Sequence, residues 1–230
     1  MSTWSAPLGA DRRVRVRVTE RPDGDLALSG DPVLLAATRR RIVDRPWVWL
    51  DQVHGAEVVV LGPSQPIEEV CGARADGIVT GRRDVVIAAH SADCATVAMW
   101  APEGVIAVAH AGWRGLRAGV LAAVADVMRA AGATTIEAYA GPRICPRCYE
   151  FGEVELASMV ERFGDAVVAT AATGAPALDV ASAVRIDLDR SEVRLVGSSP
   201  DCTSCEQDRL WSHRARHDTG RQALLVWIDR

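Results

Sequence analysis

The sequence predicts an α/β or α+β fold in which short strands and amphipathic helices stack in layers. Hydrophobic residues make up 49% of the 230 residues, which is enough apolar material for a full core. Short β-type stretches bounded by Gly, Pro and Asp mix with segments of helical spacing, in an order too irregular for a doubly wound sheet. Because no linker or break in composition divides the chain, we expect residues 1–230 to form a single domain.

The first half of the chain is mostly extended. Residues 13–18, RVRVRV, alternate with period two and predict a half-buried strand, and residues 31–43 predict a helix whose arginines face outward. Further short strands between turn residues are predicted at 48–50, 58–61, 77–80, 85–89, 96–100 and 105–109.

The periodicity changes after residue 115. Leu116, Val120, Val124 and Val127 recur at helical spacing, so we predict a helix that begins near Leu116 and ends at Gly132. The remaining predicted elements are strands at 136–140, 193–196 and 223–228 and helices at 154–163 and 178–188.

Charge and composition disfavour several classes of function. A net charge of −4 and a pI near 5.8 argue against a nucleic-acid or anionic-membrane surface, which needs clustered positive charge, so small polar substrates are expected. All 26 basic residues are arginine, which excludes a Schiff-base lysine and a P-loop lysine. The sequence contains no membrane-length apolar run and no signal-peptide core, and this predicts a cytoplasmic protein.

Polar chemistry lies where the strand at 105–109 meets the following helix. In HAGWRG, the small residues Gly112 and Gly115 let a ligand approach the backbone closely, and the helix start directs free amides toward a polar or anionic group. The alternative is structural: His110 ends a strand and Trp113 fills the core.

Two histidines and a cysteine form a candidate metal set. His54 lies in QVHG, Cys94 in SADC and His110 in HAGWRG, all at strand or loop junctions. Three N and S ligands with a fourth position open to water are typical of catalytic zinc, whereas structural zinc usually has four protein ligands. Spacing alone does not establish the site, because these residues are far apart in the sequence.

Six motifs in succession resemble those of the laccase-domain family, also called YfiH-like, polyphenol oxidoreductase or peptidoglycan editing factor. The resemblance covers about residues 45–230 through QVHG at 52–55, ADGIVT at 75–80, ADC at 92–94, HAGWRG at 110–115, GPRICPRCYE at 141–150 and SHRARHDTGRQA at 212–223. It implies a single α-β-β-α domain similar in fold to the cytotoxic necrotizing factor deamidases. It also implies a zinc ion held by His54, Cys94 and His110.

The resemblance implies more than one activity. Some members are described as purine nucleoside enzymes that carry out phosphorolysis of adenosine, inosine or methylthioadenosine, or deamination of adenosine. Others are described as editing peptidoglycan precursors, and older descriptions call them copper laccases. Two departures bear on specificity: Thr96 stands where the family usually has proline, and residues 18–27, VTERPDGDLA, replace a glycine-rich segment.

The two nucleoside reactions need different side chains. Deamination needs a carboxylate to move a proton beside a zinc-activated water, and Asp93 and Asp76 are the nearest in sequence, although either can instead cap a turn or pair with an arginine. Phosphorolysis needs a phosphate site, which Arg114, Arg214 and Arg216 can supply unless they are ordinary surface arginines.

A different class of function is an amide hydrolase that edits cell-wall precursors. In it, Cys94 would be a nucleophile activated by His110, which excludes a metal-bound thiolate in the same state. A multicopper oxidase needs more histidine ligands than the five present. A single copper can still replace zinc in a His/Cys/His set.

Three features leave alternatives open. Cys145-Pro-Arg-Cys148 and Cys202-Thr-Ser-Cys205 are two C-x-x-C pairs that can form a second metal site, a disulfide or buried thiols. His90 is close to Cys94 in sequence, but as a continuation of the strand at 85–89 its side chain can point away. His213 can stack on a base or simply pack.

We therefore predict a zinc-dependent purine nucleoside enzyme with a small-molecule substrate and phosphate. The candidate residues are Asp93, Asp76 and Cys94 for catalysis, Arg114, Arg214, Trp113 and Gly112 for substrate binding, and His54, Cys94 and His110 for the metal.

Overall fold

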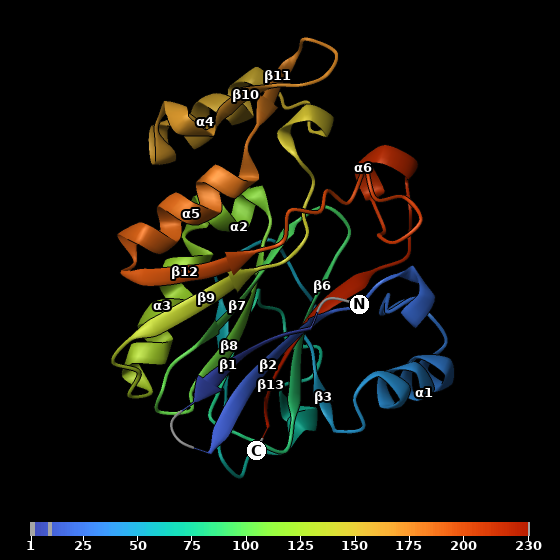
Figure 1. Ribbon diagram of the computed structural model, residues 1–230, viewed down its shortest axis with the longest axis vertical. Helices are drawn as coiled ribbons and strands as arrows, with labels where there is room; N and C mark the ends of the chain where they lie inside the picture. Colours follow the sequence, from blue (N-terminus) through green and yellow to red (C-terminus); the bar gives the residue numbers. More distant parts are fainter. Residues whose placement is uncertain (1–2, 9–10, 230) are drawn as a thin grey trace.

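The computed structural model describes residues 3–8 and 11–229, which build two main β-sheets with helices on their outer faces (Figure 1). The first sheet has the strand order β1 (Thr3–Leu8), β2 (Arg12–Val18), β13 (Gln222–Asp229), β6 (Val86–Ser91), β3 (Trp47–Val48). The second sheet has the order β12 (Val193–Ser198), β9 (Ile136–Ala140), β7 (Ala95–Trp100), β8 (Ile106–Ala111), β5 (Gly77–Thr80), β4 (Val58–Leu61).

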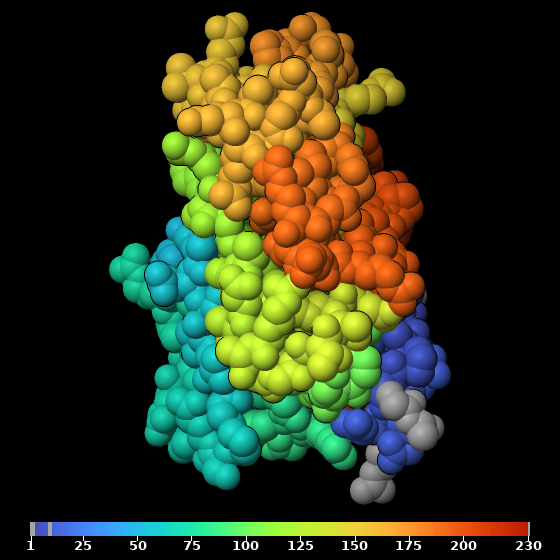
Figure 2. All heavy atoms as spheres, turned by 90° about the vertical axis from the view of Figure 1, so that its left-hand side faces the viewer, coloured from blue at the N-terminus to red at the C-terminus, as the bar shows by residue number. Residues whose placement is uncertain are grey.

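Helices cover the outer face of each sheet. The first sheet carries α1 (Pro32–Ile42), and the second carries α2 (Trp113–Ala118), α3 (Val120–Ala130), α4 (Glu153–Phe163) and α5 (Val180–Arg190). Figure 2 looks at the second helical face, where α3 and α5 lie side by side with α4 above them. The short elements are β10 (Val168–Thr170), β11 (Pro176–Leu178), α6 (His213–Arg216) and 3-10 turns at Arg21–Asp23, Ile67–Glu69, Pro146–Cys148 and Asp165–Val167.

The alternation of side chains along the strands produces the layers. In β13, Leu224 and Val226 pack between the two sheets, whereas Ala223 and Leu225 pack against α1. In β7, Trp100 packs between the sheets and neighbouring positions face α3 and α5. The central strands, β6, β7, β8 and β13, therefore bury both faces, which stabilises the fold by about 1.5–3 kcal/mol for each large apolar side chain. The predicted α-β-β-α arrangement is confirmed.

The helix predicted to begin at Leu116 is wrong at its start and in its continuity. It begins at Trp113, because the extended backbone of Gly112 forms the N-cap, and it is interrupted at Gly119, which has a φ of +91°. A glycine adopts this left-handed conformation without strain, so the chain ends one helix and starts another there. Helix α5 begins at Val180 rather than at Leu178, because Asp179 caps its N-terminus and Leu178 belongs to β11.

Four short elements lie outside the predictions: β1, the β10–β11 hairpin and α6. Each has three to six residues, too few to show a period. Within residues 3–8 and 11–229, no helix has the length and apolar character needed to cross a membrane.

Candidate metal and substrate site

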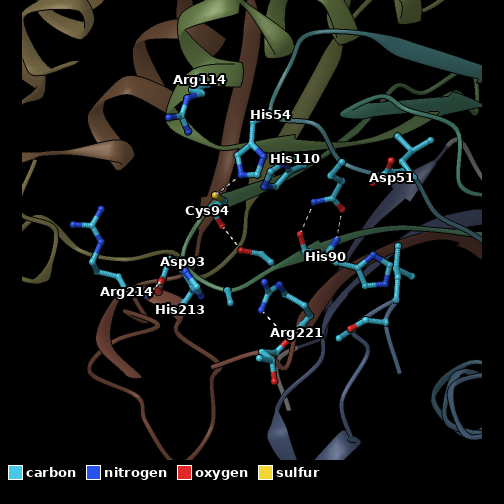
Figure 3. A pocket seen from close by; sticks show the side chains of 18 of the residues that line it. Asp51, His54, His90, Asp93, Cys94, His110, Arg114, His213, Arg214 and Arg221 are labelled. Carbon is cyan, nitrogen blue, oxygen red and sulfur yellow. Dashed lines mark hydrogen bonds between the residues drawn. The ribbon is translucent and has the colours of Figure 1, made fainter. Parts of the chain in front are cut away.

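Two of the three candidate ligands lie at the ends of neighbouring strands, and the third lies in a loop beside them. His110 follows Ile106 and Val108 on the inner face of β8, beyond the packed core. Cys94 directly precedes the neighbouring strand β7, and His54 lies in the loop between β3 and β4. Figure 3 shows the three side chains pointing toward one another.

The donor atoms of His54, Cys94 and His110 lie within 4.8 Å of one another. Cys94 Sγ is 3.9 Å from His54 Nε2, and the two imidazole rings stand edge to face with centroids 4.8 Å apart. Two imidazole nitrogens and one sulfur at this spacing suit a single zinc or copper ion. The set leaves one side for a fourth ligand from the adjoining cavity.

Asp76 holds two of these ligands in place. Its Oδ1 accepts hydrogen bonds from His110 Nδ1 at 2.8 Å and from the backbone N–H of His54 at 3.0 Å. Its Oδ2 accepts from the N–H groups of Val53 and Gly55, at 3.2 and 2.6 Å. These bonds support His54 at a φ of +60°, which is uncommon for a residue with a side chain. Burial opposes ionisation of Asp76, but the bonds from His110 and Gly55 prevail and lower its pKa.

Gly112 leaves the space in which the three ligands meet. A Cβ atom at this position would lie 2.9 Å from His54 Cδ2 and 3.0 Å from Cys94 Sγ, closer than real Cβ contacts. Gly115 allows a second close contact with the same loop, because a Cβ at this position would lie 2.9 Å from the carbonyl oxygen of Gly55. The small residues of HAGWRG therefore bring α2 against the His54 loop.

Cys94 and His110 each stabilise the charged form of the other, a thiolate and an imidazolium. Burial alone would raise the pKa of Cys94, but the nearby His110 and His54 lower it to about 6. Burial alone would lower the pKa of His110, but Cys94 and Asp76 raise it to about 9. At neutral pH these values favour a thiolate, which is the form of cysteine that binds metals and attacks electrophiles.

A cavity of about 560 Å³ adjoins the three ligands. Three arginines, Arg114, Arg214 and Arg221, contribute to its wall and surround Cys94 in Figure 3. Arg214 lies over the ring of Tyr149, at 4.9 Å, and donates a hydrogen bond to the carbonyl oxygen of Glu150. The wall therefore combines positive charge with aromatic surface, which suits a ligand that has an anionic part and a planar part.

Asp93 lines this cavity, but both of its carboxylate oxygens bind protein groups. Oδ1 accepts from Thr203 Oγ1 and Oδ2 from the backbone N–H of Arg214, each at 2.6 Å. Its φ of +98° is a strained conformation for a residue with a side chain. The carboxylate thereby connects the Cys94 loop to α6.

Arg216 lies apart from the cavity wall. Its guanidinium donates to the carbonyl oxygens of Thr203, Ser204 and Leu210 and to Asp218, so it holds the loop before α6 together.

His90 and His213 differ in their surroundings. The His90 ring points away from Cys94 in Figure 3, on the face of β6 that packs against α1, and the Gln52 side chain bonds the backbone N–H and C=O of His90. Both residues contribute to the cavity lining, but His213 lies beside Asp93, whereas the His90 ring is turned away from Cys94.

Sequence reasoning did not single out Tyr149, Arg221 or Gln52. All three belong to motifs that carry the family resemblance, and that membership was the available signal. The N-terminal segment 18–27 also reaches the cavity, through Ala27.

Comparison with known proteins shows which family the chain belongs to. The family described as multi-copper polyphenol oxidoreductase laccase matches residues 31–229. The chain belongs to this family. It is 40% identical over 185 residues to purine nucleoside phosphorylase SCO2081 of Streptomyces coelicolor, with 79% of this chain and 75% of that protein covered. It is 37% identical over 226 residues to purine nucleoside phosphorylase ORF3 of Streptomyces griseus, with 92% and 90% covered.

The fold of this laccase-family chain also matches a solved structure. The hypothetical protein YfiH of Bacillus licheniformis superimposes with a TM-score of 0.80 at 22% identity, covering 94% of this chain and 92% of that one. Among the residues that the structure describes, two clusters have donor atoms close enough for a metal: His54, Cys94 and His110, and the four cysteines 145, 148, 202 and 205. The described part of the chain therefore has a single cluster that contains histidine.

Proposed function

We propose that this chain is a zinc-dependent purine nucleoside phosphorylase. The observation that carries the proposal is that a His/Cys/His donor set and three arginine side chains face one cavity. The family membership and the names of the relatives agree with it.

The donor set fits zinc. His54, Cys94 and His110 would hold the ion, and Asp76 would keep the His110 proton on Nδ1 so that Nε2 faces the metal, as in carboxylate–histidine–zinc sites. When bound, zinc supplies a Lewis acid beside the substrate. Copper sites of the blue type add a weak axial methionine to two histidines and a cysteine, and no methionine occurs among the described residues that line the cavity. We therefore propose zinc as the resident ion and copper as a substitute.

Phosphorolysis is the reaction that uses the arginines. A phosphate oxygen attacks C1′ of the nucleoside, the C1′–N9 bond breaks, and the purine leaves with the electron pair and takes up a proton. Arg114 and Arg214 would bind the phosphate, because guanidinium groups match its oxygens in charge and geometry. Trp113 and Tyr149 would supply aromatic surface for the base.

We assign Asp93 and Asp76 positioning roles rather than proton transfer. Deamination needs a carboxylate that is free to shuttle a proton, but both oxygens of each side chain accept hydrogen bonds from the protein. Asp51 is the other carboxylate in the cavity wall and is exposed, so a deaminase reaction would depend on it.

One arrangement favours a second candidate function, amide hydrolysis with Cys94 as the nucleophile. Cys94, His110 and Asp76 stand in the order nucleophile, base and orienting carboxylate, and His110 lowers the pKa of Cys94. This reaction belongs to the metal-free state, because zinc would occupy the thiolate. Cell-wall precursors would be its substrates.

The test measures metal and product together. We expect about one zinc ion per His/Cys/His set, and with adenosine and phosphate we expect adenine and ribose 1-phosphate. Cys94→Ala and His110→Ala should lose this zinc and the turnover together, whereas Cys71→Ala should keep both, because Cys71 is a half-buried cysteine that packs against the core and belongs to neither cluster. Inosine without need for phosphate would instead show deamination. Turnover of an amide by metal-free protein, abolished by iodoacetamide, would show the nucleophile mechanism.

A further inference from the structure

We propose that Cys145, Cys148, Cys202 and Cys205 bind a structural zinc ion, separate from the His/Cys/His set. Their four sulfur atoms lie within 4.8 Å of one another, although the two pairs are 57 residues apart in sequence. Cys148 Sγ is 3.6 Å from Cys205 Sγ. Four sulfurs at about 2.3 Å from a tetrahedral zinc ion are separated by about 3.8 Å, so the cluster is already close to the required geometry.

The backbone around the sulfurs is folded in the same way in both pairs. The N–H of Cys148 bonds the carbonyl oxygen of Cys145 at 3.0 Å, and the N–H of Cys205 bonds that of Cys202 at 3.1 Å. Each C-x-x-C segment is therefore a tight turn that presents its two sulfurs to the same side. Two such turns facing each other make a four-thiolate site.

Backbone donors and one cation are placed to stabilise negative sulfur. The N–H of Cys145 lies 3.2 Å from Cys202 Sγ, and the N–H groups of Ser204 and Cys205 also point at this sulfur. The guanidinium of Arg143 is near enough to Cys202 to interact with its charge. These contacts offset part of the charge of −2 that four thiolates and one Zn²⁺ would carry.

The chemistry of the ligands selects zinc and a structural role. Four thiolates are soft ligands that disfavour Mg²⁺ and Ca²⁺, and four protein ligands leave no position for a substrate. Cys202 is buried, Cys145 and Cys148 are half-buried, Cys205 is exposed, and all six cysteines of the chain are unpaired thiols. Zinc can therefore enter from solvent without unfolding the domain.

The ion would join a segment that lines the cavity to a second segment that holds the cavity residue Asp93. Tyr149, in the cavity wall, directly follows Cys148, and Thr203, which donates to Asp93, directly follows Cys202. The same two segments meet at a bridge between Arg143 and Cys202. A zinc ion here would fix the distance between the Tyr149 ring and the Asp93 contact without touching the substrate.

The test is zinc content by mass spectrometry of the intact folded protein, compared between paired variants. Cys205→Ser should contain one zinc ion fewer than its parent and melt at a lower temperature. Cys205→His should keep the ion, because three cysteines and a histidine also bind zinc. Cys71→Ser is the matched control and should match the wild type in zinc content.

Two further measurements keep the proposal falsifiable if the serine variant fails to fold. His110→Ala protein should still hold one zinc ion, and Co²⁺ in its place should show the strong thiolate-to-metal absorption of a four-sulfur site. Alkylation of denatured wild-type protein with chelator and without reductant should modify all six cysteines. Fewer modified cysteines would show a disulfide and overturn the proposal, as would unchanged zinc in Cys205→Ser. Each comparison measures the zinc content of a variant relative to the protein from which it is made. Its result therefore does not depend on what the His/Cys/His set binds.

Discussion

His110 Nδ1 lies 2.8 Å from Asp76 Oδ1, and the same carboxylate accepts three backbone N–H groups from the loop that carries His54. One buried side chain therefore orients two candidate ligands that belong to different elements of the chain. A change at Asp76 must affect both ligands at once, and it should do so without altering any donor atom.

Asp76→Asn should weaken zinc binding about 10- to 100-fold, the usual effect of removing a ligand's hydrogen-bond partner. An amide N–H directed at His110 Nδ1 would place the histidine proton on Nε2, the nitrogen that has to bind the metal. Zinc affinity measured by competition with a chelator checks this. Asp51→Asn, in the same cavity wall, should bind zinc as the wild type does. Equal affinity in both variants would remove the orienting role of Asp76.

Gly112→Ala should lower zinc occupancy even though alanine is a small, apolar residue. The new methyl group would lie within 3.0 Å of both His54 and Cys94 and would push their side chains apart. Gly81→Ala is the control, because a Cβ there meets only the carbonyl oxygen of Gly104, at 3.8 Å. Zinc content per folded chain is the measurement, and full occupancy in Gly112→Ala would contradict the tight contact.

Asp93→Asn should retain most activity, because an amide can keep both contacts. The Asn oxygen can accept the N–H of Arg214, and the Thr203 hydroxyl can turn to accept from the Asn nitrogen. Asp93→Ala loses both hydrogen bonds and should destabilise the protein by about 2–4 kcal/mol. Unfolding in urea and steady-state kinetics on both variants check this. If Asp93→Asn lost activity more than 100-fold while remaining stable, Asp93 would be a proton carrier.

Arg114→Ala should raise the KM for phosphate about 10- to 100-fold, which corresponds to the loss of one charge-assisted hydrogen bond of 1.5–3 kcal/mol. The KM for the nucleoside should change less. Arg117→Ala, an exposed arginine of the same helix that does not line the cavity, should leave both constants unchanged. An unchanged KM for phosphate in Arg114→Ala would show that the anion binds elsewhere.

His90 should make the protein less stable in acid. Burial lowers the pKa of this histidine to about 3, and neither ring nitrogen has a hydrogen-bond partner among the described residues. Below about pH 6.5, His90 takes up a proton in the unfolded chain but stays neutral in the folded chain. The free energy of unfolding therefore has its full value above that pH and falls as the pH drops toward 3. Between pH 7 and pH 5, His90→Leu should lose about 2 kcal/mol less unfolding free energy than the wild type. Equal losses in His90→Leu and the wild type would refute the assignment.

The layered fold could be predicted from the sequence because short apolar stretches between turn residues and segments of helical spacing are both local patterns. Residues 223–228 predict a strand, and the structure confirms β13. The position of β13 between β2 and β6 could not be predicted. Leu224 pairs with Val18, but these residues are far apart in the sequence, and no local pattern indicates that they pair. The break at Gly119 was missed because a left-handed glycine does not interrupt the pattern of apolar residues on either side.

The candidate site could be predicted only in part. The motifs pointed to His54, Cys94 and His110, which the structure brings together; that they bind a metal stays a prediction. Residue types alone left Asp76 and Asp93 open as proton carriers or as structural carboxylates, because a sequence does not show which oxygens already accept hydrogen bonds. Tyr149 was missed because it comes to face the cavity only when the 145–148 turn meets the segment at 202.

The central place of β13 in the first sheet sets the order in which the molecule can be assembled during synthesis. Both of its neighbours, β2 and β6, emerge from the ribosome earlier and leave unpaired edges that face each other across the missing strand. Such edges are sites where other chains can add, so the nascent protein is most prone to aggregate just before residues 222–229 appear. All three candidate metal ligands have been made by then, whereas Arg214 and Arg221 are made only shortly before β13, so the part of the cavity wall that they form is the last part of the candidate site to be completed.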